Sequence, residues 1–178
     1  MDIFEIIKQR RSIRQFSSKE ISDSIIKDIL YYGTLSPSAH NKQPWEFVVI
    51  KNKNIKDKIA DLLIEEDMKD GKESSKTKTA LVMREAPVLI LVFNKYNDEH
   101  ILFNTLSLGA CIENMLLAAK GYGLGSLWIG NICKVDKEVC KLLNHKNTLV
   151  SAIALGYYEE EIKEPSRNLV DLITEWRW

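Results

Sequence analysis

Apolar and polar positions alternate with the period of an α-helix in the N-terminal third of the chain. Residues 3–7, 25–30 and 55–63 each bring their apolar side chains to one side of a helix. A short polar residue that can cap a helix precedes each run. These caps are Asp2, Ser22 and Asn54. We therefore expect three helices here, the second ending at Gly33 and the third near Gly71.

Runs of branched and aromatic residues predict four β-strands. They are residues 47–50, 88–93, 124–129 and 150–157. Residues 101–120 are apolar almost all round, which predicts a helix buried on every side, in the core or against a partner subunit. We also expect a short helix around residues 139–143 and a last helix capped by Asn168. Helices and strands that mix without strict alternation are typical of an α+β fold.

No repeat or linker divides the chain, and 178 residues are a common length for one domain. We therefore expect a single domain over residues 1–178. The stretch from Asp67 to Thr79 is rich in lysine and other polar residues, and this composition predicts a mobile segment.

Charge and composition narrow the classes of partner. Lys plus Arg and Asp plus Glu both number 25, so the formal net charge is zero. Because nucleic-acid-binding proteins normally carry a basic excess, we expect no nucleic-acid partner. The N-terminus has acidic residues where a signal peptide needs basic ones, and we judge the apolar stretches too short to span a bilayer. These features predict a cytoplasmic protein that does not bind a membrane.

Cysteine and histidine are sparse. The three cysteines, Cys111, Cys133 and Cys140, form no CxxC pair, and the three histidines are scattered. This pattern predicts neither a disulfide framework nor a metal site. We expect reduced thiols, none of which has a nearby sequence partner that would mark it as a nucleophile.

The segment Arg10-Arg11-Ser12-Ile13-Arg14 places three guanidinium groups and a hydroxyl within five residues. The planar donors of arginine suit phosphate oxygens or a ring carbonyl. A solvated basic turn has the same composition. On its own, the segment supports either interpretation.

The segment from Ser36 to Trp45 is a loop rich in turn-forming residues, and Pro37 and Pro44 stiffen its two ends. It also carries the short polar side chains of Ser38, Asn41 and Gln43. Such a loop can line a polar heterocycle. It can equally be an ordinary helix-to-strand connection built from Asx and Ser turns.

The glycine-rich segment from Gly121 to Gly130 has some likeness to a dinucleotide-binding motif. That motif follows a strand and opens a helix, whereas these glycines close a long helix and lead into a strand. Gly121 and Gly123 are better explained as helix C-caps. Gly130 ends a strand, where the missing side chain lets backbone N–H groups approach a ligand.

The last segment with candidate chemistry runs from Gly156 to Arg167. It places one arginine in an acidic tail that contains Pro165. A surface ion pair is the alternative interpretation.

Taken together and in this order, the four segments resemble the motifs of the nitroreductase family of FMN-dependent oxidoreductases. The family opens with an RRSxR-type motif, matched by residues 10–14, and continues with a PSxxNxQPW-type loop, matched by residues 37–45. A GLGSxWIG-like segment is present as residues 123–130, and a Gly-Tyr tail with an arginine as residues 156–167. The resemblance runs from residue 2 to about residue 170.

The resemblance implies a central, mostly antiparallel sheet flanked by helices, and FMN held between the subunits of an intertwined homodimer. Arg14 would lie near the flavin N1 and C2 carbonyl, where a cation stabilises the reduced ring. The other implied contacts fall into three groups. Arg10, Arg11, Ser12 and Arg167 would serve the phosphate and ribityl chain, and Pro37, Ser38, Ala39 and Asn41 would come from the other subunit. The backbone of Trp128, Ile129 and Gly130 would face N5 and O4.

The implied activity is transfer of electrons from NADH or NADPH to a small organic acceptor, such as a nitroaromatic compound or a quinone. No catalytic side chain is implied, because the flavin carries the chemistry. Two alternatives stay open. One is a flavin-storing or flavin-sensing module with little turnover, and the other is a specialised member that dehalogenates, desaturates or consumes its own flavin. Larger members place an asparagine and a lysine against the flavin pyrimidine edge, and residues 76–86 match neither clearly.

Overall fold

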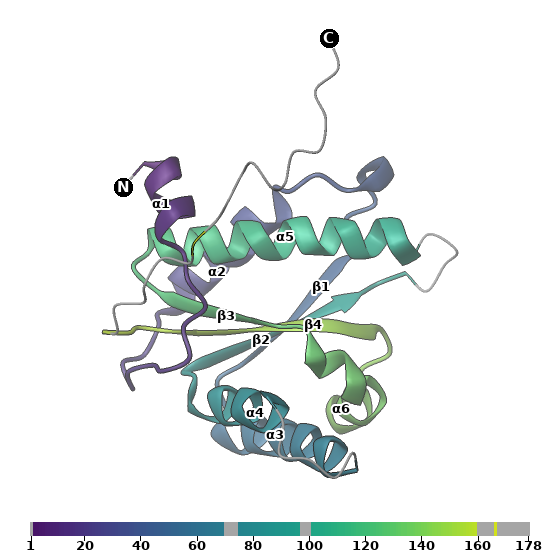
Figure 1. Ribbon diagram of the computed structural model, residues 1–178. Coiled ribbons are helices and arrows are strands. Elements are labelled where there is room, and N and C mark those ends of the chain that lie inside the picture. Colours follow the sequence, from purple (N-terminus) through teal and green to yellow (C-terminus); the bar gives the residue numbers. More distant parts are fainter. Residues whose placement is uncertain (1, 70–74, 97–100, 160–165, 167–178) are drawn as a thin grey trace.

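A four-stranded antiparallel sheet forms the centre of the protein (Figure 1). The structure is a computed structural model that describes residues 2–69, 75–96, 101–159 and 166, with backbone only for residues 75–77. The strands are β1 (Trp45–Ile50), β2 (Val88–Asn94), β3 (Gly125–Ile129) and β4 (Thr148–Gly156), in the order β1-β2-β4-β3. All three neighbouring pairs are antiparallel, so the α+β prediction with a mostly antiparallel sheet is confirmed.

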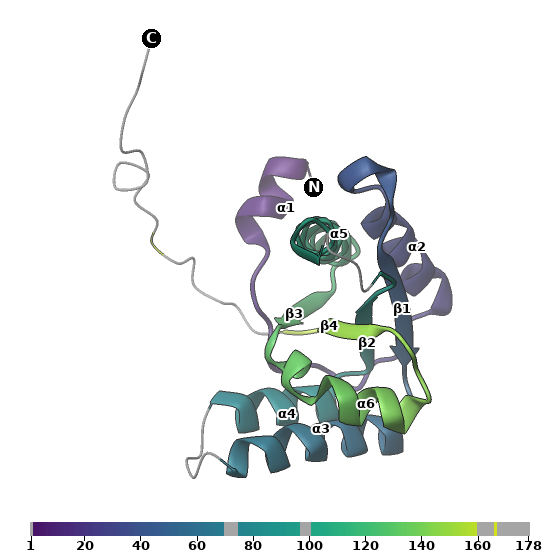
Figure 2. The same ribbon diagram turned by 90° about the vertical axis from the view of Figure 1, so that its right-hand side faces the viewer.

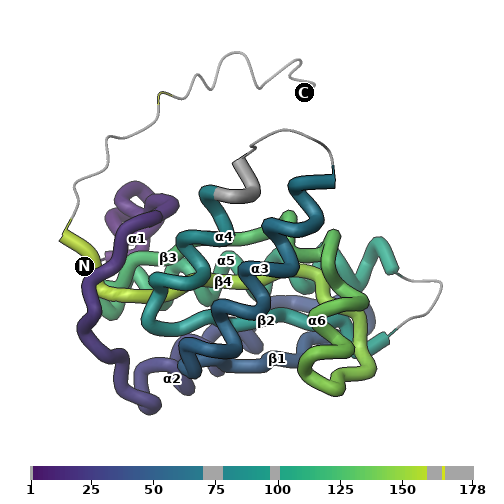
Figure 3. Tube along the Cα trace, turned by 90° about the horizontal axis from the view of Figure 1, so that it is seen from below, coloured from purple at the N-terminus to yellow at the C-terminus, as the bar shows by residue number. Residues whose placement is uncertain are grey.

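Helices cover both faces of the sheet, so the protein has three layers (Figure 2). On one face lie α1 (Ile3–Gln9), α2 (Asp23–Thr34) and α5 (Ile101–Gly121). On the other face lie α3 (Lys53–Met68), α4 (Ser75–Glu85) and α6 (Asp136–Leu143), which Figure 3 shows over the strands. Two 3₁₀ turns, η1 (Ala39–Asn41) and η2 (Asn131–Val135), lie in the connections.

Strand β2 explains why a sheet with two covered faces forms here. All seven of its residues are buried, and successive side chains of a strand point to opposite faces. Leu89, Leu91 and Phe93 join the core beneath α3, α4 and α6. Val88, Ile90 and Val92 join the core beneath α2 and α5. A continuous apolar run therefore serves two cores at once.

Capping residues set the helix starts. The side chains of Asp2 and Ser22 accept hydrogen bonds from the backbone N–H groups of Glu5 and Ile25, as expected. The cap of α3 is Asn52, not Asn54, because the Asn52 Oδ1 accepts from the Ile55 N–H at 3.1 Å. The prediction of Asn54 was therefore wrong by half a turn.

Three further expectations about elements need correction. Strand β1 begins at Trp45, two residues before the predicted start. Helix α4, which begins at Ser75, was not among the expected elements, and residues 70–74 of the stretch expected to be mobile lie outside the described residues. Gly121 is the last residue of α5 and not its cap, whereas Gly123, with φ of 73°, does take the left-handed conformation of a C-cap. The predicted helix after Asn168 lies outside the described residues.

Within one chain, helix α5 is buried on one face only, so burial of its other faces would need the partner subunit that the prediction allowed. One face of the helix, from Asn104 to Ala119, is buried and packs between the sheet and α2, with Leu108, Ile112 and Met115 in the core. Near its N-terminus, Leu102 and Leu106 are 65% and 64% exposed. The helix is long and apolar enough to cross a membrane by length and composition, so the prediction that every apolar stretch is too short was wrong. Its packing against the sheet accounts for the apolar residues of the buried face.

Candidate active site

The arginine cluster is fixed to the outer edge of β3. After α1, Ser12 forms a parallel bridge with Ser126, and the Ile13 N–H donates to the Ser126 carbonyl at 2.9 Å. The Ile13 side chain is only 2% exposed and anchors the segment in the fold. Because the bridge is parallel, Arg14 follows in the direction of Trp128. The sheet edge therefore brings the first and third sequence motifs together.

The three arginines of this segment point their donors to different partners. The Arg10 Nε lies 3.4 Å from Glu113 Oε1 on α5. The Arg11 Nη1 donates to the Lys8 and Arg10 carbonyls, whereas its Nε is buried without a hydrogen-bond partner among the described residues. Arg14 is exposed and donates through Nη1 to the Ser12 carbonyl at 3.2 Å. A buried guanidinium N–H that lacks an acceptor fits an anionic oxygen such as a phosphate.

The second half of the β3 edge offers backbone groups. The N–H and C=O groups of successive strand residues alternate between the two sides of the strand. The Ser126 carbonyl points outward to Ile13, so the Trp128 N–H and C=O and the Gly130 N–H also point outward. Gly130 is exposed, and no described atom lies within 4 Å of the position that a Cβ would take. This edge can receive a planar heterocycle with donor and acceptor atoms along one side.

The loop before β1 is held in a defined shape. His40, Asn41 and Gln43 take left-handed backbone conformations with φ of 50–53°, which is uncommon for residues other than glycine. The Gln43 N–H donates to Ser38 Oγ at 3.0 Å, and the Ala39 N–H donates to Ser107 Oγ on α5 at 3.2 Å. The loop is therefore a preformed polar surface.

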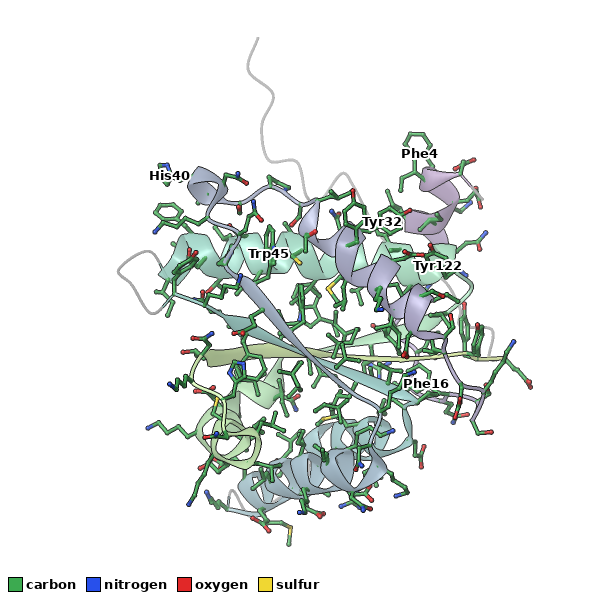
Figure 4. The ribbon with its side chains drawn as sticks, turned by 180° about the vertical axis from the view of Figure 1, so that it is seen from behind. Phe4, Phe16, Tyr32, His40, Trp45 and Tyr122 are labelled. Carbon is green, nitrogen blue, oxygen red and sulfur yellow. The ribbon has the colours of Figure 1, made fainter. Side chains whose placement is uncertain are left out.

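The structure does not bring this loop to the arginine cluster within one chain. Figure 1 shows α1 at one end of α5, and Figure 4 shows Phe4 of α1 and His40 at opposite ends of that helix. The polar contacts agree with the pictures, because Arg10 reaches Glu113 whereas Ala39 reaches Ser107. Pro37, Ser38, Ala39 and Asn41 are thus at the other end of α5 from the α1 end of the arginine segment. Arg167 lies outside the described residues.

An apolar face lies between the two groups. Exposed apolar side chains on α1, at the end of α2 and near the start of α5 form it, with Phe4 the most exposed at 77%. They are Ile3, Phe4, Ile7, Tyr31, Tyr32, Leu35, Ile101, Leu102, Phe103 and Leu106. An apolar hollow of about 440 Å³ opens between α1, α2 and α5, lined partly by Ile6 and Leu117. Exposed apolar side chains in this number, where they form one patch, mark interaction sites.

The thiols do not contribute to this site. Burial raises the pKa of Cys111 to about 12, and burial together with the bond to Asp136 raises the pKa of Cys140 to about 11. Cys133 is exposed on η2, and Cys140 lies within α6. Among the described residues, no group of three or more His, Cys, Asp or Glu side chains could hold a metal ion.

Sequence reasoning missed two serines that support the site. Ser107 fixes the loop through Ala39, and Ser151 on β4 contacts both the Trp128 side chain and the Ile129 carbonyl. Ser107 lies outside the recognised motifs, and Ser151 stood in a predicted strand as one polar residue among apolar ones. The pattern alone could have singled out Ser151, because a polar residue inside a buried strand needs a hydrogen-bond partner.

Comparisons with known proteins find relatives that match most of the chain. The model of the nitroreductase family matches residues 7–157. An Archaeoglobus fulgidus protein, provisionally named NADH dehydrogenase/NAD(P)H nitroreductase, is 32% identical over 90% of this chain and 87% of its own length. An iodotyrosine dehalogenase 1 homolog from Caenorhabditis elegans is 27% identical over 97% of this chain and 60% of its own length.

The fold is also that of solved structures. A protein from Desulfovibrio desulfuricans, provisionally named a nitroreductase and crystallised in complex with FMN, superposes with a TM-score of 0.80. It is 29% identical, and the match covers 99% of this chain and 97% of that one.

Proposed function

Because the chain belongs to the nitroreductase family of oxidoreductases, we propose that it binds FMN, takes hydride from NADH or NADPH and reduces a small organic acceptor such as a nitroaromatic compound or a quinone. The free edge of β3 is the observation that carries the proposal. There the Gly130 N–H points outward beside open space, and the parallel bridge brings Arg14 to the same edge. The FMN in the Desulfovibrio desulfuricans relative supports the choice of cofactor.

Each part of the edge suits one part of FMN. Arg10, Arg11 and Ser12 would hold the phosphate and ribityl chain, and the partnerless Arg11 Nε gives that phosphate a buried donor. Arg14 would place its charge at N1 and O2, where negative charge collects on reduction. The Trp128 to Gly130 backbone would face N5 and O4. Bound FMN supplies the hydride chemistry, and these residues bind and orient it.

We further propose that the functional unit is an intertwined homodimer in which each site uses two chains. Pro37, Ser38, Ala39 and Asn41 would reach the flavin of the partner, since they lie at the opposite end of α5 from Arg10 in their own chain. The apolar face between the two groups would then form the interface. Obligate interfaces of this kind bury roughly 2,000 Å² or more.

Two coarser features complete the proposal. We place the protein in the cytoplasm, and we treat residues 1–178 as one domain. The neutral net charge supports a small-molecule acceptor rather than a nucleic acid as partner.

A specialised dehalogenase is the second candidate function. Similarity to the Caenorhabditis elegans iodotyrosine dehalogenase homolog over 97% of this chain favours it. The same flavin edge would serve both reactions, so the two candidates differ in the acceptor and not in the cofactor. A flavin-storing or flavin-sensing module would bind FMN equally but show little turnover.

One set of measurements tests the proposal. The purified protein should be yellow and release FMN on denaturation, and anaerobic titration with NADH or NADPH should bleach it. A panel containing a nitroaromatic compound, a quinone and iodotyrosine should then reoxidise it with one preferred acceptor. Recovery of FAD, or a colourless protein that ignores added FMN, contradicts the proposal. Preference for iodotyrosine supports the dehalogenase, and bleaching without turnover supports the flavin-storing or flavin-sensing module.

Mixing two damaged variants tests the shared site. One variant carries Arg10→Ala and Arg14→Ala, and the other replaces Ser38 and Asn41 by bulky residues. Heterodimers should contain one intact and one doubly damaged site and recover up to half of the wild-type activity per dimer. Arg84→Ala is the matched control for the loss of an arginine outside the site. Arg84 on α4 pairs with Asp61 on α3, in the helix layer on the other face of the sheet from α1 and α5. Verified heterodimers without recovery, or a yellow active monomer, refute the shared site.

A further inference from the structure

A buried hydrogen-bond chain lies directly behind the β3 edge. The Trp128 indole Nε1–H donates to Ser151 Oγ at 2.7 Å, and the Ser151 hydroxyl donates to the Ile129 carbonyl at 3.0 Å. Ser151 itself is only 2% exposed. The indole N–H can only donate, so the serine oxygen accepts there and its single proton is left for Ile129. The direction of both bonds is therefore fixed by chemistry.

The Ile129 carbonyl and the Gly130 N–H belong to the same peptide unit. That unit is planar and trans, so its C=O and N–H point in opposite directions. The carbonyl points inward to β4, where Ile129 pairs with Ala152 and contacts Ser151. The N–H must then point outward to the free edge. A contact inside the sheet thus sets the direction of a donor outside it.

The peptide at the end of β3 needs a contact that fixes its orientation. Strand β3 ends at Ile129, and Gly130 takes a helical conformation with φ of −79° and ψ of −33° as the cap of η2. Gly130 has no side chain to hold it, and the space beside it is open. On β4, the register shifts next to Ser151, which faces Val92 while Leu149 faces Phe93. A bulge of this kind re-aims a side chain, here toward the last carbonyl of β3.

We infer that Ser151, with its rotamer held by Trp128, is a positioning residue that aims the Gly130 N–H at the flavin N5. The inference rests on the proposed function, because it assigns the ligand at this edge. Oxidised N5 accepts a hydrogen bond, whereas reduced N5 carries a proton and cannot. A well-aimed Gly130 N–H therefore favours oxidised flavin and lowers the midpoint potential.

The direction of the shift in midpoint potential distinguishes the role of Ser151 from that of Arg14. The Arg14 cation favours reduced flavin, so its loss lowers the potential. Loss of the Ser151 hydroxyl frees the Ile129–Gly130 peptide and weakens the bond to oxidised N5. A merely structural role for Ser151 predicts lower stability and no change in potential.

The test is the FMN midpoint potential of the full-length holoprotein. Ser151→Ala should lose up to about tenfold of its preference for oxidised over reduced flavin, which is an upward shift of up to about 30 mV for a two-electron couple. Ser151→Thr keeps the hydroxyl and should restore the wild-type potential. Trp128→Phe removes the indole N–H and should give a smaller upward shift.

Ile153→Val is the matched control for general loosening of β4, because Ile153 is fully buried and packs in the core on the α2 and α5 side. It should lower stability without moving the potential. Yellow Ser151→Ala protein with an unchanged or lowered potential refutes the inference alone. If Ser151→Ala does not fold, the midpoint potential of Trp128→Phe tests the inference instead, and an unchanged or lowered potential refutes it. Absence of FMN from the wild-type protein overturns the proposed function and the inference together.

Discussion

The contact between α2 and α5 allows a sharp test of core packing through Gly33. An added Cβ at Gly33 would lie 2.5 Å from Met115 Cγ, 3.1 Å from Met115 Sδ and 3.2 Å from Cys111 Sγ. Favourable contacts between such atoms need about 3.5–4.0 Å, so Met115 must move by about 1 Å. Met115 is fully buried, so it can move only by displacing its core neighbours. Gly33→Ala should therefore destabilise the fold.

The expected change in the free energy of unfolding for Gly33→Ala is the difference between two effects. Overpacking a core costs about 1–3 kcal/mol, whereas replacing a helix glycine by alanine gains up to about 1 kcal/mol. Gly109→Ala on α5 isolates the second term, because the nearest atom to its added Cβ, Trp128 Cη2, lies at an ordinary 3.8 Å. We expect Gly109→Ala to stabilise the protein and Gly33→Ala to be about 1–3 kcal/mol less stable than Gly109→Ala.

Urea unfolding at one fixed protein concentration measures the stability of both variants, since the proposed dimer would make stability depend on concentration. Adding Met115→Ala to each variant completes the test. The truncated side chain makes room for the new methyl group, so Met115→Ala should cost less stability in the Gly33→Ala protein than in the Gly109→Ala protein. A Gly33→Ala protein as stable as Gly109→Ala, or no coupling with position 115, would refute the packing argument.

Three more predictions concern charges and thiols. Arg14→Ala should lower the FMN midpoint by about 20–65 mV, from 1–3 kcal/mol for a charge-assisted contact; an unchanged potential in yellow protein would place Arg14 elsewhere. At pH 8 a thiol reagent should label exposed Cys133 first, because burial raises the pKa of Cys111 to about 12 and of Cys140 to about 11, and a folded triple Cys→Ser variant should keep its turnover. Burial lowers the pKa of Lys56, whose Nζ donates to the Ala86 carbonyl, so the unfolded state binds more protons between that lowered pKa and the ordinary 10.5. The free energy of unfolding of the wild-type protein, minus that of Lys56→Met, should therefore rise with pH through this window in urea titrations. A difference that does not change with pH would contradict the lowered pKa of Lys56.

Much of the fold could be predicted because local patterns and tertiary contacts agree. Asp2 and Ser22 cap their helices with no help from the rest of the chain. Strand β2 is recognisable because all of its residues are apolar up to Phe93, and burial on both faces explains why. These elements need only nearest neighbours in sequence or a simple periodicity.

Sequence patterns failed to predict elements whose structure depends on contacts between residues far apart in the chain. Helix α4 has a polar N-terminal half, yet it packs on α3, and Ala80 and Met83 are fully buried in the same core as Leu63. Nothing local distinguishes Asn52 from Asn54 as a cap, because both are asparagines before the same apolar run.

The candidate site divides in the same way. Sequence motifs indicated residues 10–14 and 128–130, and the bridge between Ser12 and Ser126 accounts for their meeting at one edge. Motifs could not indicate the role of Ser151, because that role depends on the pairing of β3 with β4. The separation of the loop at His40 from Phe4 on α1 is likewise a property of the packed helices.

An exposed strand edge is normally a liability, because its unpaired N–H and C=O groups invite pairing with other chains. Among the described residues, the segment at Ser12 and Ile13 covers the first part of the outer edge of β3 and then diverges from it. The remaining part carries the Trp128 and Gly130 groups, and a buried serine fixes the last of them from behind. A fold that leaves an edge open and also commits a buried hydrogen-bond chain to its orientation has shaped that edge for a ligand. A flat ring with alternating donors and acceptors along one side satisfies it, which is the physical reason that flavin suits this position.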